Sequence, residues 1–176
     1  MIHARTAFAF AALLLTASHS GVALAQKIGV VDMQRALMET EDGRTAKDQL
    51  KKLFESRQKT LDKQQNDLKS MKESVEKQRD VLAADVWAKK VEALQKALAE
   101  LQTTYMEFQR ELAAKESEMT RPILERMQRI MRRIGQAEGY TLILERAEAG
   151  VVFVPTSYDL TDVLIQRYNA GDGKGE

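Results

Sequence analysis

Apolar side chains recur at alternating steps of four and three residues in the second half of the chain. The pattern runs through Trp87, Val91, Leu94, Leu98, Leu101, Tyr105, Phe108 and Leu112. The spacing averages 3.5 residues, which is the period of a helix that packs against a partner helix as in a coiled coil. The pattern therefore predicts a long helix with one continuous apolar side.

A second, weaker repeat precedes this one. Its apolar positions recur every seven residues, at Phe54, Leu61, Leu68, Val75 and Leu82. The positions between them are mixed: Leu50, Arg57, Gln64, Met71 and Gln78. A sparsely apolar helix can cover one side of a richly apolar helix, so we expect the two segments to pack against each other.

The helical region is bounded by two glycines. No other glycine lies between Gly43 and Gly135. We therefore predict a helical hairpin, called the arm, over residues 44–134, with its tip near residues 83–86 and Asp85 as the N-cap of the second helix. At about 1.5 Å per residue, roughly 38 residues would reach about 55 Å. Pro122 is the only proline in this region, and it predicts a kink or a helix restart and is the candidate hinge.

Residues 26–43 and 135–176 predict a small head. Short apolar runs at residues 26–31, 140–144 and 151–154 predict strands, the last two close enough to form a hairpin. One helix should follow Asp32 and end at residues 41–43, and another should run from Asp159 to about Asn169. Residues 171–176 are expected to form a flexible tail. The fold class is α+β and mostly helical.

A head of this size predicts association with other copies. About 60 residues make a marginal core, and short strands leave unpaired edges. We expect head residues to be completed by oligomerisation, with these candidates at the contacts: Val30, Leu142, Leu144, Val152 and Val154.

The first 25 residues resemble a secretory signal. A weakly positive start precedes an apolar run from Ala7 to Ala17 that is too short to span a bilayer, and Ala23-Leu24-Ala25 offers a small-x-small cleavage pattern. We expect cleavage after Ala25 and export to the periplasm.

Composition limits the chemistry. The chain has no cysteine, and both histidines, His3 and His19, lie in the expected signal. Histidine and cysteine catalysis and the usual zinc sites are thereby excluded from the mature chain. The run from Gly171 to Gly175 lacks the Ser or Thr and the helix of a phosphate loop. We expect no cofactor, no metal and no enzymatic activity, although a carboxylate-based enzyme stays as a minor alternative.

Charge divides the chain into two parts. Residues 44–134 carry 21 basic and 15 acidic side chains, whereas residues 26–43 and 135–176 together carry 5 basic and 11 acidic ones. Residues 63–100 around the tip carry 8 basic and 7 acidic side chains. The nearly neutral tip argues against binding of anionic lipid or lipopolysaccharide, and the few aromatic residues argue against binding of nucleic acid.

Several motifs together resemble the OmpH-like family of periplasmic outer-membrane-protein chaperones. They are the start at residues 27–32, the return of the arm at residues 122–124, the run at residues 139–144, and the ending at residues 152–154 and 159–164. The resemblance implies a homotrimer whose head strands form a small barrel and whose three arms enclose a cavity. It also implies a holdase that binds unfolded outer-membrane proteins there without ATP.

Three residues are candidates for client contact: Trp87, Met71 and Met106. Trp87 lies near the tip, where little partner surface can cover an indole. The methionines can form an adaptable surface, but they can equally fill gaps in an imperfect coiled coil. The alternative function is a structural coiled-coil tether of the cell envelope, which would need one permanent partner.

Overall fold

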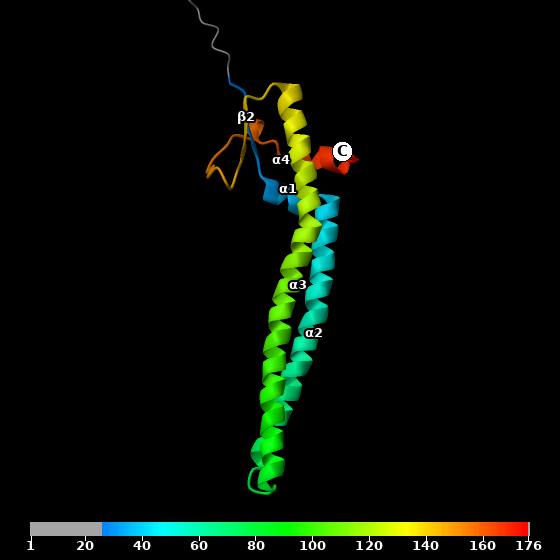
Figure 1. The fold of residues 1–176 in the computed structure, drawn as a ribbon. Coiled ribbons are helices and arrows are strands. Elements are labelled where there is room, and N and C mark those ends of the chain that lie inside the picture. Colours follow the sequence, from blue (N-terminus) through cyan, green and yellow to red (C-terminus); the bar gives the residue numbers. More distant parts are fainter. Residues whose placement is uncertain (1–25, 176) are drawn as a thin grey trace, which may run out of the picture.

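The computed structural model describes residues 26–175, so the expected signal sequence lies outside the described residues. Figure 1 shows two long helices that leave a small head side by side and form a narrow arm. The fold class is confirmed: the chain is mostly helical, with long helices and a small two-stranded sheet. Among the described residues, no helix is both long and apolar enough to cross a membrane.

The arm consists of helix α2 (Glu41–Lys77) and the N-terminal part of helix α3 (Ala84–Glu138). The predicted helix boundaries differ from the observed ones at the tip. Helix α2 ends before Leu82, and helix α3 begins at Ala84 with Ala83 as its N-cap, so Asp85 lies in the first turn and is not the cap. Residues at a solvated tip have few tertiary contacts to extend a helix, and helix ends are weakly specified there.

The start of helix α2 also differs from the prediction. The break after helix α1 (Met33–Glu39) lies at Thr40, whose side chain accepts a hydrogen bond from the amide of Gly43 at 3.3 Å. Gly43 is therefore inside the first turn of α2 and does not break the helix. A side chain there would collide with the carbonyl oxygen of Leu37, only 1.6 Å from the position of an added Cβ. The glycine permits α1 and α2 to meet closely.

Pro122 does not restart the returning helix. Helix α3 runs without interruption through Pro122. Directly after the proline, Ile123, Met127 and Ile130 are buried in the core of the head. This packing keeps the helix continuous although the proline has no backbone N–H to donate. A hinge at Pro122 remains a prediction.

The sheet is parallel, not a hairpin. Strand β1 (Ile28–Val31) pairs with strand β2 (Leu142–Glu145) in the register Ile28 to Leu142 and Val31 to Glu145. The arm is thus the crossover between two parallel strands, which always need a long connection. The predicted strand at residues 151–154 is wrong for this chain: after β2 the backbone turns, and residues 151–155 have no strand partner. The other side of β1 is already contacted through a bridge from Val30 to Asp159.

The head core lies where α3 meets both ends of the chain. Helix α4 (Thr161–Asn169) begins at Thr161, after the short 3₁₀ helix η1 (Thr156–Tyr158). Helix α4 packs against α1 and α3, and its Leu164 is fully buried together with Ala36, Met127, Ile130 and Ile134. Residues at i, i+3, i+4 and i+7 on α3 supply one side of this core.

Candidate functional site

The arm has two different long edges. One edge, called the apolar edge, carries Phe54, Leu61, Leu68 and Val75 of α2 beside Val91, Leu98, Tyr105 and Leu112 of α3. A shallow hollow confirms this juxtaposition at mid-arm, and it is lined by Phe54, Gln58, Leu61, Tyr105, Phe108, Gln109 and Leu112. Equivalent heptad positions of antiparallel helices meet along the same edge, which explains why these two apolar rows coincide.

The opposite edge is polar. Arg57 pairs with Glu111 at 2.8 Å and lies over the ring of Phe108, 5.6 Å from its centroid. The amide of Gln64 donates to the hydroxyl of Thr104 at 3.4 Å. The hydrogen bond and the charge of Glu111 raise the pKa of Arg57 above its ordinary value. The polar edge fixes the register of the helices through specific pairs, whereas the apolar edge is free of such pairs among the contacts described.

Two helices cannot cover all of this apolar surface. Phe54, Leu98, Tyr105 and Met106 are between 49% and 53% exposed. Away from the head core, the buried apolar residues of the arm are Leu61, Val75 and Phe108, and each lies at the contact between the helices. The arm therefore presents half-exposed apolar side chains to any molecule beside it.

The three predicted client-contact residues are not brought together. Met106 is half-exposed at mid-arm. Met71 is partly buried beside Lys90 and Ala93, close to the tip. Trp87 is also partly buried, and its indole Nε1 is buried without a hydrogen-bond partner. Client contact by these residues remains a prediction.

Sequence reasoning missed Phe54, Leu98 and Tyr105 as exposed apolar residues. Their heptad spacing is interpreted mainly as the seam of the hairpin, with a client-binding face as the lesser alternative. The sequence does carry a signal for them, because both helices have an apolar row that falls on the same edge of the arm. A pair of helices buries only the side of each row that faces the other helix.

The head carries a second exposed apolar surface. Val152 is 95% and Phe153 is 82% exposed, Leu142 of β2 is half-exposed, and Leu144 and Val154 are partly buried. Val30, by contrast, is buried inside the chain's own head. A groove of about 780 Å³ runs between α3 and β2, and its apolar lining includes Leu124, Met131 and Ile143. Exposed apolar side chains beside an open groove are typical of a surface that another chain covers.

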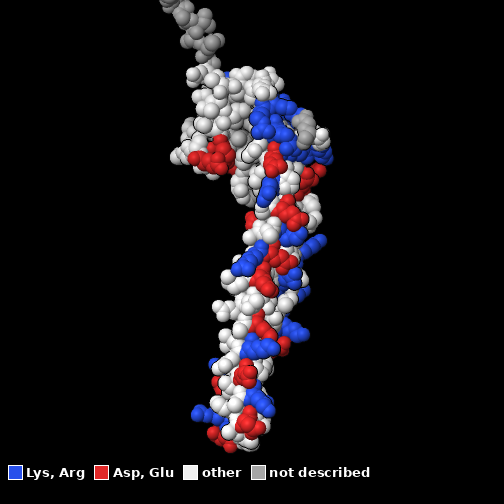
Figure 2. All heavy atoms as spheres, viewed as in Figure 1, with Lys and Arg blue, Asp and Glu red and all other residues white. Residues whose placement is uncertain are grey.

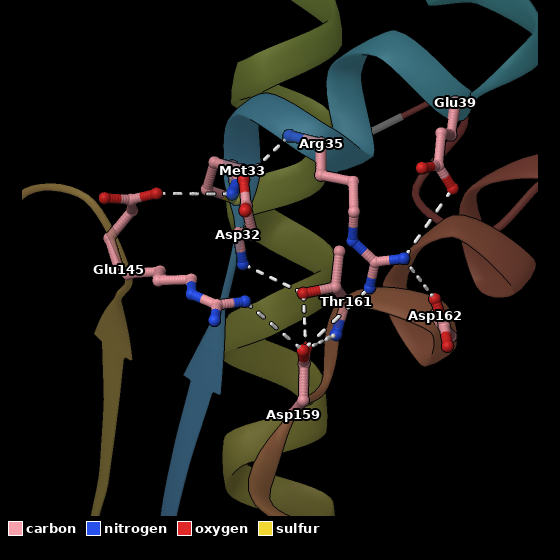
Figure 3. Close-up of polar contacts among 9 residues, drawn as sticks. Asp32, Met33, Arg35, Glu39, Glu145, Asp159, Thr161 and Asp162 are labelled. Atoms are coloured by element: carbon pink, nitrogen blue, oxygen red, sulfur yellow. Dashed lines mark hydrogen bonds and ion pairs between the residues drawn. The ribbon is translucent and has the colours of Figure 1, made fainter. Parts of the chain in front are cut away.

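A polar network holds the two ends of the chain together in the head (Figure 3). The amide of Asp32 donates to the Thr161 hydroxyl at 2.9 Å, and the guanidinium of Arg35 binds Asp162 at 2.8 Å. The amide of Met33 donates to Glu145 at 3.3 Å. These contacts fix α1 against β2 and α4.

Asp159 is the most shared acceptor of this network. It accepts hydrogen bonds from the amide and hydroxyl of Thr161 and lies within 4.0 Å of Arg35 and 3.9 Å of Arg146. Partial burial alone would raise the pKa of Asp159, but the hydrogen bonds from Thr161 and the two nearby positive charges lower it below its ordinary value. Asp159 is thus an ionised structural group.

Arg126 joins the arm to the head. Its side chain is buried, stacks on the ring of Tyr168 at 3.8 Å, and donates to the carbonyl oxygens of Tyr168 and Asp172, each at 2.7 Å. Asp42 completes the cluster: it lies 3.7 Å from Arg126 and accepts a hydrogen bond from the Tyr168 hydroxyl at 2.8 Å. Helices α2, α3 and α4 all meet at this one guanidinium.

The C-terminal segment is correspondingly ordered, so the prediction of a flexible tail is corrected for residues 171–175. Asp172 pairs with Arg133 at 2.7 Å, and Gly173 is buried against Arg126 and Ile130. Two basic side chains of α3, Arg126 and Arg133, therefore neutralise part of the acidic head. Figure 2 shows this basic group beside the head, and shows acidic and basic side chains interleaved along the visible face of the arm.

Comparisons with known proteins agree with this architecture. The family model of the outer membrane protein (OmpH-like) family matches residues 27–168. A crystal structure of a candidate outer membrane chaperone (OmpH-like) from Caulobacter crescentus CB15 superposes with a TM-score of 0.70, 17% sequence identity, and coverage of 82% of this chain and 85% of that chain. At this identity the likeness concerns the fold alone. Comparison with curated protein sequences gives no match. Because the family model spans most of the chain, the protein belongs to the outer membrane protein (OmpH-like) family.

Proposed function

We propose that the protein is an ATP-independent holdase chaperone of the periplasm, which binds unfolded outer-membrane proteins between helical arms and prevents their aggregation. The arm supports this most strongly: in a chain of the OmpH-like family, two long helices project from the head and expose apolar side chains along one edge. Unfolded clients expose apolar surface, and contact with this edge removes part of it from water.

The proposed assembly is a homotrimer formed by the heads. Strand β2 pairs only with β1 in the part of the chain that the structure describes, and the segment that follows it, residues 151–155, belongs to no strand and exposes Val152 and Phe153. An open strand edge beside an exposed apolar segment is a template for pairing with another chain. Three arms suspended from a common head would enclose a space for a client.

The charge distribution suggests how a client is captured and held. The arm carries an excess of basic side chains, whereas its tip is close to neutral. Screening limits the range of these charges to about 8 Å at physiological ionic strength. We propose that the basic surface speeds the encounter with an acidic client and that apolar contact holds it.

Suppression of aggregation tests the proposal. A urea-denatured outer-membrane β-barrel protein is diluted into buffer without nucleotide, with and without an excess of the mature protein, and light scattering is followed. We expect scattering to be suppressed when the protein is present. Unchanged scattering would overturn the holdase proposal and favour a structural tether, which has no need to bind unfolded chains.

A further inference from the structure

The last described residues of the chain lie at the junction of the arm and the head. Helix α4 ends at Asn169, and the chain then contacts α3 through a run of turns over residues 170–175, which we call the strap. Figure 1 shows this end of the chain, in red, beside α3. The match to the family model ends at residue 168, so the strap lies outside the matched part of the chain.

The strap is bound to α3 by charged contacts and by close packing. The carbonyl oxygen of Asp172 accepts a hydrogen bond from Nε of Arg126 at 2.7 Å, and its carboxylate pairs with Arg133, also at 2.7 Å. Gly173 is buried, and a Cβ added there would lie 3.2 Å from Cγ of Arg126 and 3.4 Å from Cγ1 of Ile130. The strap therefore fits closely on α3, with no room for a larger side chain at this glycine.

The sequence of the strap suits this path. Gly171 and Gly173 have φ values of 93° and 73°, a conformation that other residues rarely adopt. These two glycines let the backbone turn on both sides of Asp172, whose carboxylate then reaches α3.

The residues just before the strap are bound to the other helix of the arm. The side-chain oxygen of Asn169 accepts a hydrogen bond from the amide of Glu41 at 3.1 Å. The hydroxyl of Tyr168 donates to Asp42 at 2.8 Å. The end of α4 is thus attached to the first turn of α2, while the strap that follows it is attached to α3.

The strap lies next to a weak point of α3. Pro122 has no N–H to donate to the carbonyl of Glu118, so α3 lacks one helical hydrogen bond near the base of the arm. A hollow of about 500 Å³ lies beside this point, and its lining includes residues of α2, α3 and the strap: Ala46, Gln49, Met119, Pro122, Gly173 and Gly175. Helices bend most readily at prolines, and a hollow beside Pro122 leaves room for such a bend.

We propose that the strap fixes the direction of the arm relative to the head, and that its release lets the arm bend at Pro122. While the strap is bound, α3 is held to α4 beside the hollow. A short segment of turns with few buried contacts opens at a lower free energy than the core, so the strap is suited to release. The proposal goes beyond the proposed function and does not depend on it, because it concerns the junction within one chain.

Spin labels measure the direction of the arm. The chain has no cysteine, so cysteines introduced at two exposed positions, Lys63 on α2 and Gln166 on α4, are the only labelling sites. Double electron–electron resonance gives the distribution of distances between the two labels in the full mature protein. Each labelled chain is mixed with an excess of unlabelled chains, which keeps distances between chains out of the measurement. The labelled protein with an intact strap is the reference.

Removal of the strap should free the arm. In a variant that lacks residues 171–176, we expect a distance distribution about twofold wider than in the reference, since the contacts of Asp172 and Gly173 with α3 are lost. Adding Pro122→Ala to this variant should narrow the distribution again, because alanine restores the helical donor. An unchanged width on removal of the strap would overturn the proposal. A width that Pro122→Ala does not reduce would overturn the location of the bend.

A matched pair of substitutions separates loss of the strap's contact from local strain. Gly173→Val and Gly175→Val both place a β-branched residue at positive φ, 73° and 84°. Only at Gly173 would the side chain collide with α3, because nothing lies within 4 Å of a Cβ added at Gly175. We expect Gly173→Val to widen the distribution about 1.5-fold and Gly175→Val to leave it as in the reference. Equal widths for the two variants would contradict the proposal.

A second pair of labels tests whether the arm itself stays intact. Cysteines at Lys63 and Glu92 lie at exposed positions on the two helices of the arm, away from its base. We expect the distribution between them to be the same with and without the strap, because the contacts between α2 and α3 along the arm are unchanged. Widening of this distribution would show that loss of the strap loosens the whole arm rather than its junction with the head, and would overturn the proposal.

Discussion

Single side chains decide how the arm is attached to the head. Arg126 is buried at the junction, yet its charge is satisfied by two carbonyl oxygens, an aromatic face and the carboxylate of Asp42. Arginine suits this position because its planar guanidinium can donate in several directions and stack at the same time. The sequence pattern places Arg126 among the basic residues of α3 and offers no sign that it is the one turned inward.

Arg126→Ala should destabilise the protein strongly. The variant loses two hydrogen bonds from a charged donor and leaves buried carbonyl groups unsatisfied, so we expect a decrease in the free energy of unfolding of about 2–4 kcal/mol. Urea denaturation followed by circular dichroism measures it. Arg110→Ala, at an exposed position of the arm, is the control and should change the free energy by no more than about 0.5 kcal/mol.

Asp159 makes stability depend on acid pH. Its pKa is lowered in the folded chain from an ordinary value of 3.8, so its ionised form stabilises the fold above that value. This contribution is lost as the pH falls below 3.8 and through the lower pKa of the folded state. We expect Asp159→Asn to cost about 1 kcal/mol at pH 7, and the difference from wild type to disappear in strong acid.

The measurement for Asp159 is urea denaturation at neutral pH and at two acid values, one on each side of 3.8. Asp162→Asn is the control, because that side chain is 80% exposed and its pair with Arg35 is solvated. A difference between wild type and Asp159→Asn that is the same at all three pH values would mean that ionisation of Asp159 does not stabilise the fold.

Among the elements, the long helices were predictable and the strand pairing was not. Heptad spacing is a local property, so the apolar residues from Trp87 to Leu112 predicted the arm directly. Local alternation of apolar residues cannot identify a partner strand at the far end of the chain, so residues 140–154 were interpreted as a hairpin while β2 pairs with β1. The ordered tail was missed for the same reason: its partners, Arg126 and Arg133, are distant in sequence.

Two glycine substitutions test the junction of α1 and α2. Gly43→Ala places a methyl group against the carbonyl of Leu37, so the helices must separate, and we expect a loss of about 1–3 kcal/mol, as for overpacking of a core. Gly135→Ala is the control: it lies inside α3, and its nearest neighbour, the Cδ1 atom of Ile143, is 3.4 Å away. Thermal or urea unfolding should show Gly135→Ala to be neutral or more stable by about 0.5–1 kcal/mol. Equal losses for both would show that contact with Leu37 is unimportant.

At the scale of the whole molecule, the head leaves surfaces that a lone chain does not cover. Phe153 and Val152 extend into solvent beside the open edge of β2, and a groove lies between β2 and α3. A core of this size gains stability when further strands are added to its sheet. The arm also leaves apolar side chains half-exposed along one edge, but its two helices already pack against each other.

Val152→Asp should dissociate the proposed trimer. The side chain is exposed in the chain itself, so a charge there costs little in a monomer, whereas burying it between subunits without a partner costs several kcal/mol. Multi-angle light scattering should give a trimer mass for the wild type and a monomer mass for the variant at micromolar concentration. Thr156→Asp, an exposed position beyond the same segment, serves as the control. A monomer mass for the wild type would refute the trimer.

The parallel pairing of β1 and β2 also favours one order of folding. The hydrogen bond from Met33 to Glu145 joins positions 112 residues apart, whereas the pair of Gln64 and Thr104 in the arm joins positions only 40 apart. Closing the longer loop in an unstructured chain costs more entropy and is slower. A hairpin that forms from its tip toward its base removes this cost, because it brings the two strands to the same place before they pair. Folding of the arm therefore brings together the distant parts of the chain that form the head.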